Sequence, residues 1–353
     1  MSEVNSVELH NLGVRFTRER RYSDAIDCLY QAAEAGQIIS NKALFSALIA
    51  TGRFPEAWRT ARTYLSLVPH DFAFADHFFA EIFQFGLASQ PHYDQVQTGG
   101  KPFVSFVICS HRDQCFSVVR QEIERAAIAY PHEIIRIPDA KSMGDGYQRG
   151  FNQSRGEIVV LCHDDIEFGV PDFMARLVEV LEGADMVGVA GSRQMTGPAT
   201  LFDGHPHIVG RVIQPCTGGA GDGRAGYEFC AFSLTALRSP AQVLDGVFIA
   251  ARRDLLSAIQ FDTAIPGFHY YDVDLSYRAY LSGARVAVAS DLTLFHKSKG
   301  SYDQNWFQSK EYFARKFPQL NGTPGNAHHY YKRPFFDRKM FLSLSQAFNE
   351  AMI

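Results

Sequence analysis

Residues 159–165 read Val-Val-Leu-Cys-His-Asp-Asp, an apolar run that ends in an imidazole and two carboxylates. An apolar run of this kind is typical of a buried strand in a parallel sheet. In open α/β sheets, ligands bind beyond the carboxyl ends of the strands, which is the place of His163, Asp164 and Asp165. Carboxylates at that place suit a divalent cation, and a cation suits phosphate groups. The stretch therefore predicts an enzyme that uses a nucleotide.

Strand-like and helix-like segments alternate on both sides of this stretch. The strand-like segments are residues 104–109, 134–137, 158–162 and 186–190, and the helix-like segments are 117–130, 146–154 and 171–181. Their alternation predicts an α/β fold with a mostly parallel, doubly wound sheet. Residues 191–239 are rich in Gly, Pro and His and show little periodicity. A long irregular insert near a site is more often functional than structureless.

The first 90 residues have a different pattern of apolar residues. Apolar residues recur there at helical spacing, and Leu12 to Leu44 and Ala25 to Ala57 are both 32 positions apart. A near-constant offset of this length indicates a helix-turn-helix repeat. Residues 71–86, which are rich in Phe, are expected to form a capping helix that docks on the next domain. This region is therefore expected to be a small all-α domain.

The repeat resembles the tetratricopeptide repeat. The matching packing positions are Leu12, Gly13, Phe16, Ala25 and Ala32 in the first unit and Leu44, Gly52, Ala57 and Pro69 in the second. Phe45 stands where the second unit would carry glycine, and Gln37 where the first would carry proline. Because such stacks usually need three or more units to bury their faces, a generic helical domain remains the alternative. Either a protein acceptor or a second copy of the chain would suit such a module.

Composition excludes several classes of protein. The 353 residues are enough for one large domain and a smaller one, and a formal net charge of −4 gives no support for a nucleic-acid partner. There is no apolar run of roughly 18 residues, so we expect no transmembrane segment. Residues 1–6 carry an acid and no apolar signal region, so we expect a cytoplasmic location. Six cysteines without a Cys-x-x-Cys pair favour reduced thiols over a disulfide or zinc framework.

Several blocks from residue 104 onward resemble a family 2 type glycosyltransferase, which has the GT-A fold. The blocks are residues 104–113, 133–139, 149–157, 163–165, 245–253, 261–262 and 271–278, with Gly283 and His296. The details are most similar to StrF-like proteins of streptomycin biosynthesis, with His-x-Asp at the strand tip and Phe-His-Tyr-Tyr-Asp-x-Asp at 268–274. The resemblance implies a GT-A domain at about 102–318. A helical domain at 1–90, a linker at 91–101 and a C-terminal extension with a terminal helix at 319–353 would complete the chain.

The resemblance implies a divalent cation, Mn²⁺ or Mg²⁺, at the strand tip. The family motif there is Asp-x-Asp, and Asp165 stands in the register of a metal ligand. His163 replaces the first aspartate, so it either binds the metal or turns away. His296 matches a late histidine that completes the metal site in related transferases. Helix capping by Asp164 or Asp165, and an ordinary polar role for His296, are the alternatives.

The resemblance further implies Asp272 as the general base of an inverting transfer. A carboxylate must take the proton of the acceptor hydroxyl as it attacks the anomeric carbon. Tyr271 replaces a family glutamate, a departure expected to alter acceptor contacts. Asp274 is expected to cap the helix at 275–281, and capping is also the alternative for Asp272.

The donor is expected to lie against other strand ends. The candidate nucleotide and donor contacts are Ser110, His111, Asp139, Arg149, Asp164 and Asp245. Gly246, next to Asp245, would let backbone approach the sugar. Lys297 and Lys299 could meet the diphosphate as cations. The aromatic pairs 306–307 and 312–313 either stack on an acceptor sugar or, as is more usual at helical spacing, belong to a core.

These features imply sugar transfer from a nucleoside diphosphate sugar to a hydroxyl of a glycan, glycolipid or protein, in bacterial glycan biosynthesis. Two alternatives remain open. The first is a catalytically inactive binding protein of GT-A type, which His163 and Tyr271 make possible. The second is a sugar-phosphate nucleotidyltransferase, although residues 110–113 lack the Gly-rich loop and lysine that such an enzyme would carry.

Overall fold

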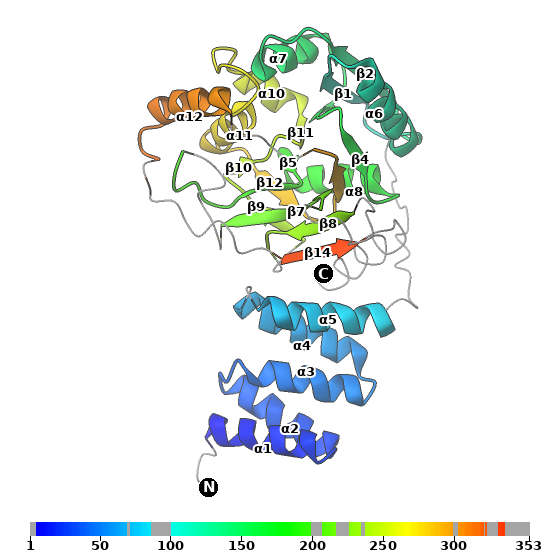
Figure 1. The fold of residues 1–353 in the computed structure, drawn as a ribbon, viewed down its shortest axis with the longest axis vertical. Helices are drawn as coiled ribbons and strands as arrows, with labels where there is room; N and C mark the ends of the chain where they lie inside the picture. Colours follow the sequence, from blue (N-terminus) through cyan, green and yellow to red (C-terminus); the bar gives the residue numbers. More distant parts are fainter. Residues whose placement is uncertain are drawn as a thin grey trace. The chain divides into compact units, whose positions relative to one another are not determined.

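The computed structural model describes residues 5–68, 71–85, 100–198, 207–216, 226–233, 237–298, 303–320, 322 and 331–335. The described residues fall into two compact units, a helical unit up to residue 85 and an α/β unit from residue 100 onward (Figure 1). This arrangement confirms the prediction of an α/β domain preceded by an all-α region. Most of the predicted linker at 91–101 and of the extension at 319–353 lies outside the described residues. None of the described helices combines the length and the apolar character that crossing a membrane requires.

The helical unit is a succession of helices joined by short turns. They are α1 (Ser6–Arg18), α2 (Tyr22–Glu34), α3 (Ser40–Ala50), α4 (Phe54–Leu67) and α5 (Phe72–Phe85). A Cβ atom at Gly13 would lie 2.5 Å from Cγ of Leu29, so the close approach of α1 to α2 requires glycine there. The ring of Phe45 lies 5.3 Å from Phe74 and 5.7 Å from Phe78, both in α5. The residue that departs from the repeat pattern therefore fills the space between α3 and α5, and the tetratricopeptide assignment stays a prediction.

The central sheet of the α/β unit has the order β2-β1-β3-β11-β5-β12-β9. Its strands are β1 (Val104–Cys109), β2 (His132–Ile137), β3 (Ile158–Cys162), β5 (Met186–Gly188), β9 (Arg238–Pro240), β11 (Phe248–Arg252) and β12 (Val286–Ala289). β1 is parallel to β2 and β3, and β12 is parallel to β5. β11 is antiparallel to both of its neighbours, β3 and β5. β12 is antiparallel to β9, so five of the seven strands run in the same direction, as in the mostly parallel, Rossmann-like sheet that the resemblance predicts.

Helices cover both faces of this sheet (Figure 1). They are α6 (Asp113–Ala126), α7 (Met143–Gln153), α8 (Phe173–Gly183), α10 (Arg253–Ile259) and α11 (Tyr271–Leu281), and α12 (Gln304–Lys316) packs on α11. Along β3, Val160 and Cys162 pack with α6 and α8, whereas Val159 and Leu161 pack with α7 and α11. Side chains alternate between the faces of a strand, so the apolar run is buried on both sides as predicted.

A second sheet has the order β10-β6-β7-β13-β4, with β8 beside β7 and β14 beside β8. Its strands are β4 (Ile166–Phe168), β6 (Ala190–Ser192), β7 (Ile208–Pro215), β8 (Tyr227–Ala231), β10 (Val243–Leu244), β13 (Leu294–His296) and β14 (Tyr331–Phe335). The predicted strand at 186–190 divides into β5 and β6, which belong to different sheets. The described parts of the 191–239 insert contain β7, β8 and β9, so the tract is more regular than its composition indicates.

Candidate active site

Three potential metal ligands meet where the two sheets adjoin. His163 and Asp165 lie in the turn between β3 and β4, and β13 pairs antiparallel with β4 so that His296 is opposite Ile166. Nδ1 of His163 lies 3.3 Å from Nε2 of His296 and 4.0 Å from Oδ1 of Asp165. Nε2 of His296 lies 3.4 Å from the same oxygen. Strand pairing thus brings together residues that are more than 130 positions apart in sequence.

This cluster has the donor set and the spacing of a cation site. All three ligand atoms lie within 4.8 Å of one another. A cation about 2.1 Å from each ligand separates neighbouring ligands by about 3 Å, so a small inward movement suffices. Two imidazole nitrogens and one carboxylate oxygen suit Mn²⁺ and other first-row metals better than they suit Mg²⁺, which prefers oxygen alone. The residues therefore fit a divalent cation with positions left for oxygens of a ligand.

The pKa values of the three residues in the cluster shift in different directions. Burial, together with the neighbouring His296, lowers the pKa of His163. Although burial alone would raise it, the pKa of Asp165 is lowered because His296 donates a hydrogen bond to its carboxylate. Burial alone would lower the pKa of His296, but the hydrogen bond to Asp165 raises it. Metals bind the neutral imidazole and the ionised carboxylate, so the shifts of His163 and Asp165 favour metal binding, whereas His296 would release a proton when a metal binds.

Tyr271 determines how the His163 ring is oriented. Its buried hydroxyl donates to the carbonyl oxygen of Gly246 at 2.9 Å and lies 3.1 Å from Nε2 of His163. Since the hydroxyl proton is committed to Gly246, Nε2 of His163 donates to Tyr271 and Nδ1 faces the cluster. His163 therefore turns toward Asp165 and His296, and Tyr271 orients it.

Asp272 occupies the first turn of α11, beside Tyr271. The backbone N–H of Gly246 donates to its Oδ2 at 2.7 Å. Burial, and next the charge of Asp245, raise the pKa of Asp272 to about 7. A Cβ atom at Gly246 would lie 2.1 Å from the Tyr271 hydroxyl and 2.9 Å from Oδ2 of Asp272. Gly246 was expected to let the backbone approach a sugar, but the atoms that a Cβ there would meet belong to the side chains of Tyr271 and Asp272 in α11.

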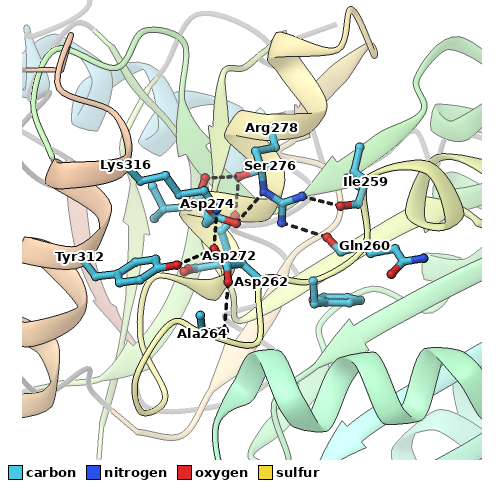
Figure 2. A network of polar contacts seen from close by, with 12 residues as sticks. Ile259, Gln260, Asp262, Ala264, Asp272, Asp274, Ser276, Arg278, Tyr312 and Lys316 are labelled. Atoms are coloured by element: carbon cyan, nitrogen blue, oxygen red, sulfur yellow. Dashed lines mark hydrogen bonds and ion pairs between the residues drawn. The ribbon is translucent and has the colours of Figure 1, made fainter.

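The expectation that Asp274 caps a helix at 275–281 is wrong. The helix begins at Tyr271, and Asp274 is a buried residue of its first turn. Its carboxylate accepts from Nε of Arg278 at 2.7 Å and from Nζ of Lys316 at 2.5 Å. Lys316 also contacts Oδ2 of Asp262 at 2.6 Å, an oxygen that the hydroxyl of Tyr312 reaches at 3.1 Å. Figure 2 shows how these charges join α11, α12 and the loop that carries Asp262.

Ser276 forms a second attachment of α11. Its Oγ donates to the carbonyl oxygen of Asp272 at 2.6 Å and accepts from the backbone N–H of Leu244 at 2.9 Å. Ser276 is fully buried. One hydroxyl thus fixes the turn that carries Asp272 against the segment that leads into Asp245 and Gly246.

The predicted donor contacts lie at the strand ends, in two groups. Oγ of Ser110 donates to Oδ2 of Asp164 at 2.6 Å, which joins the end of β1 to the end of β3. Arg149 donates to Oδ1 of Asp139 at 2.7 Å and, more weakly, to Asp145 at 3.4 Å. These contacts keep polar groups at the carboxyl edge of the sheet, where the sequence predicted a nucleotide.

The remaining predicted contacts differ in their surroundings. His111 and Asp245 are exposed, and Oδ1 of Asp245 accepts from the backbone N–H of Val247 at 2.9 Å. Nζ of Lys297 pairs with Glu167 at 2.7 Å rather than standing free for a phosphate. Lys299 lies outside the described residues.

Sequence reasoning missed Arg136, Ser276 and the orienting role of Tyr271. Arg136 donates to the carbonyl oxygen of Ser110 at 2.9 Å and pairs with Asp113 at 2.7 Å, so it fixes the loop after β1. Arg136 could have been identified from the sequence, because it is a charged residue inside the otherwise apolar strand 134–137. Ser276 and Tyr271 carried no such signal, since their roles depend on the distant residues 244–246.

Comparison with known proteins gives one family. A family model described as "Glycosyltransferase like family" matches residues 105–317. A curated relative from Fuscovulum blasticum, named "ATP synthase subunits region ORF 6", is 31% identical over 172 residues, which are 46% of this chain and 60% of that protein. The match thus spans only about three fifths of the relative's length.

Two solved structures are similar to this chain at low sequence identity. The mannosyltransferase PcManGT from Pyrobaculum calidifontis, in complex with GDP-Man and Mn²⁺, is 11% identical with a TM-score of 0.40, covering 84% of this chain and 83% of that one. TarS 1–349 from S. aureus is 14% identical with a TM-score of 0.35, covering 69% and 70%.

Proposed function

We infer that this chain, which belongs to the glycosyltransferase-like family, transfers a sugar from a nucleoside diphosphate sugar to an acceptor hydroxyl, with inversion and with a divalent cation. The observation that supports this proposal most directly is that a possible metal site and a possible general base lie next to each other. A cluster of His163, Asp165 and His296 is joined through Tyr271 to the turn that carries Asp272. A metal-dependent inverting transfer needs those two elements, a cation for the leaving diphosphate and a base for the nucleophile.

Nδ1 of His163, a carboxylate oxygen of Asp165 and Nε2 of His296 would hold the cation. When bound, it supplies Lewis-acid stabilisation of the charge on the departing diphosphate. Asp164 and Ser110 fix the floor of the donor site, and Asp139 offers a carboxylate to the nucleoside. Asp245 stands where the sugar would lie, on the segment between β10 and β11.

Asp272 would remove the proton from the acceptor hydroxyl. A general base works best when its pKa lies near the working pH, and burial has raised the pKa of Asp272 to about 7. The N–H of Gly246 and the hydroxyl of Ser276 hold the carboxylate and its backbone in place. Inversion rather than retention is proposed because of the resemblance to family 2 type glycosyltransferases, in which Asp272 matches the general base.

The two alternatives from the sequence are less well supported. An inactive binding protein was suggested by His163 and Tyr271, but Nδ1 of His163 lies 3.3 Å from Nε2 of His296, and the Tyr271 hydroxyl lies 3.1 Å from Nε2 of His163. Nucleotidyl transfer would need a lysine and a Gly-rich loop after β1, where the chain carries Ser110 and residues 111–113. The helical unit is proposed to bind a protein acceptor or a second copy of the chain.

A thermal-shift screen tests the proposal directly. UDP-, GDP- and dTDP-sugars are measured with and without Mn²⁺, and the true donor should raise Tm only when the cation is present. A donor at 100 times its Kd stabilises the fold by about 2.7 kcal/mol. Asp272→Asn should keep this shift and lose transfer by about 10²- to 10⁴-fold. Absence of any shift, together with no turnover of any donor, would refute the proposed function.

A further inference from the structure

The end of β1 lies between the two regions in which the proposed function places the donor. In the central sheet, β1 stands between β2 and β3 and runs parallel to both. Its carboxyl end therefore lies at the same edge as Asp139, which follows β2, and as His163 and Asp165, which follow β3. Adjacent strands are about 4.8 Å apart, so a donor that extends from Asp139 to the metal ligands crosses the end of β1. The segment that leaves β1 at this crossing carries Arg112.

Arg112 is fixed at its backbone and open at its side chain. It is the N-cap residue of α6, and Oγ of Ser110 lies 3.3 Å from its carbonyl oxygen. On either side of it, Arg136 donates to the carbonyl oxygen of Ser110 at 2.9 Å and pairs with Asp113 at 2.7 Å. The side chain of Arg112, by contrast, is 57% exposed. The backbone thus determines where the side chain begins, while the guanidinium stays accessible to a ligand.

The guanidinium of Arg112 lies beside the residue that separates two of the potential metal ligands. Its Nη2 is 3.7 Å from Oδ1 of Asp164, which stands between His163 and Asp165 in the chain. This separation is too long for a hydrogen bond, and among the described residues the guanidinium forms none. Oδ2 of Asp164 accepts from Oγ of Ser110 at 2.6 Å, so this carboxylate is held without Arg112. The N–H groups of Arg112 are therefore available to an anionic ligand.

Three other cations at this edge of the sheet are more firmly attached than Arg112. Arg136, Arg149 and Lys297 each have a carboxylate oxygen at 2.7 Å. An exposed ion pair as long as that of Arg112 with Asp164 contributes little to stability. Its exchange for a contact with a phosphate therefore costs little, whereas the other three cations would each have to leave a close partner.

A divalent cation at the cluster does not by itself balance the charge of a diphosphate. Imidazoles bind metals in their neutral form, so a divalent cation held by His163, His296 and the Asp165 carboxylate leaves a single net positive charge. A diphosphate carries a negative charge on each of its phosphates. The planar guanidinium of arginine can donate two parallel N–H groups to one phosphate, a geometry that lysine lacks. Arg112 would supply the missing charge and would also orient the phosphate that it contacts.

We propose that Arg112 binds the diphosphate of the donor beside the divalent cation, and that it exchanges its contact with Asp164 for a contact with phosphate when the donor binds. This inference rests on the proposed function and adds to it a residue that recognises the diphosphate. After transfer, the same contact holds the nucleoside diphosphate product, whose terminal phosphate has gained negative charge. Since that charge develops as the bond between the sugar and the diphosphate breaks, a guanidinium already in place stabilises the transition state more than the donor.

Binding of a nucleoside diphosphate and of its nucleoside distinguishes contact with phosphate from support of Asp164. UDP, GDP and dTDP are titrated calorimetrically into the parent protein with Mn²⁺, and the nucleoside of the tightest one then competes with it. In Arg112→Gln the Kd of the diphosphate should rise at least tenfold, whereas the Kd of the nucleoside, which has no phosphate, should change less than twofold. Arg112→Lys keeps the charge without the planar fork, so its Kd for the diphosphate should lie between those of the parent and Arg112→Gln.

Arg120→Gln is the matched control, because Arg120 is a similarly exposed arginine of α6, at 59%, and pairs with Glu124. It should leave both dissociation constants unchanged, and neither glutamine variant should lower the ligand-free Tm appreciably. Equal increases in the Kd of the diphosphate and of the nucleoside in Arg112→Gln would mean that Arg112 acts only by holding Asp164. Unchanged values would mean that Arg112 does not contact the donor, and either result refutes the inference.

The parent protein separates this inference from the function on which it rests. If it binds a nucleoside diphosphate and transfers sugar while Arg112→Gln binds that diphosphate equally well, only the inference about Arg112 is refuted. If the parent protein binds none of the three diphosphates with Mn²⁺ and turns over no nucleotide sugar, the proposed function itself fails.

Discussion

The two sides of the candidate site are held by different means. On the metal side, the pairing of β4 with β13 sets His296 opposite Ile166, and the N–H of Lys297 donates to the carbonyl oxygen of Asp165. On the base side, side chains hold the first turn of α11, through Ser276 and the ion pairs of Asp274. Backbone pairing survives the loss of a side chain, whereas a side-chain network does not. Substitutions should therefore affect chemistry alone on the metal side, and both chemistry and stability on the base side.

The largest effect should come from Asp165→Ala. Loss of the carboxylate ligand should abolish the Mn²⁺-dependent thermal shift and lower transfer by about 10³-fold, since the cation supplies several kcal/mol of stabilisation. The backbone of Asp165 keeps its place beside the strand pairing, so the metal-free Tm should fall only by the contribution of the carboxylate, whose lowered pKa shows that it stabilises the folded state. Calorimetry with and without Mn²⁺ measures both quantities. A large fall in the metal-free Tm would break the distinction between the two sides.

Tyr271→Phe tests the distinction between the two sides more finely. The Tyr271 hydroxyl contacts His163 on the metal side, and Tyr271 precedes Asp272 on the base side. Without the hydroxyl, His163 loses the partner of its Nε2 and is less firmly oriented. Mutation of such outer partners typically costs 10- to 100-fold in metal affinity. Titration calorimetry with Mn²⁺ should show that loss while the fold is retained. Unchanged affinity would mean that His163 needs no orienting partner.

The pH profile should report on the base side. The raised pKa of Asp272, about 7, means that the carboxylate fraction falls roughly tenfold for each pH unit below that value. Turnover should therefore rise with pH and level off above about 7. A carboxyl pKa raised by folding makes the folded state less favourable as pH increases from about 4 to 7. Asp272→Asn should remove both the fall in turnover below pH 7 and this part of the stability profile. If turnover still falls below pH 7 in this variant, the titration belongs to another group.

The smallest effect on turnover and the largest on stability should come from Lys316→Met. Asp274 is 1% exposed and would lose one of its two cationic partners, at a cost of about 3 kcal/mol. Arg315→Met is the matched control, because Arg315 is 72% exposed and its loss should cost less than about 0.5 kcal/mol. Urea unfolding measures both. If Lys316→Met and Arg315→Met have the same free energy of unfolding, the ion pairs of Lys316 do not hold the base side.

Local pattern was enough to predict some of these features and not others. The strand 158–162 and its polar tip were readable because an apolar run buried on both faces needs no distant partner to be recognised. Helix limits were less accurate, as the helix predicted at 117–130 begins at Asp113. Strand β7 was missed inside a Gly-rich tract because its burial depends on pairing with β6 and β8.

The site residues divide in the same way, into those that the local sequence reveals and those whose roles depend on distant partners. His296 was identified through a family resemblance, since nothing near it in the chain reveals that β13 pairs with β4. The role of Asp274 was misjudged because its partner Lys316 is 42 positions away. Tyr271 looked like a departure from a motif, and only its contact with His163 gives it a function.

The reversed direction of β11 has a consequence for engineering. Because Phe248 pairs with Cys162, the start of β11 lies beside the end of β3, and the segment entering β11 reaches the same edge as the segment leaving β3. That entry segment is short, residues 245–247 between β10 and β11, and its two ends are anchored in separate sheets. If the proposed function holds, exchange of this short segment is the way to alter the sugar accepted, with Asp245 varied and Gly246 left unchanged.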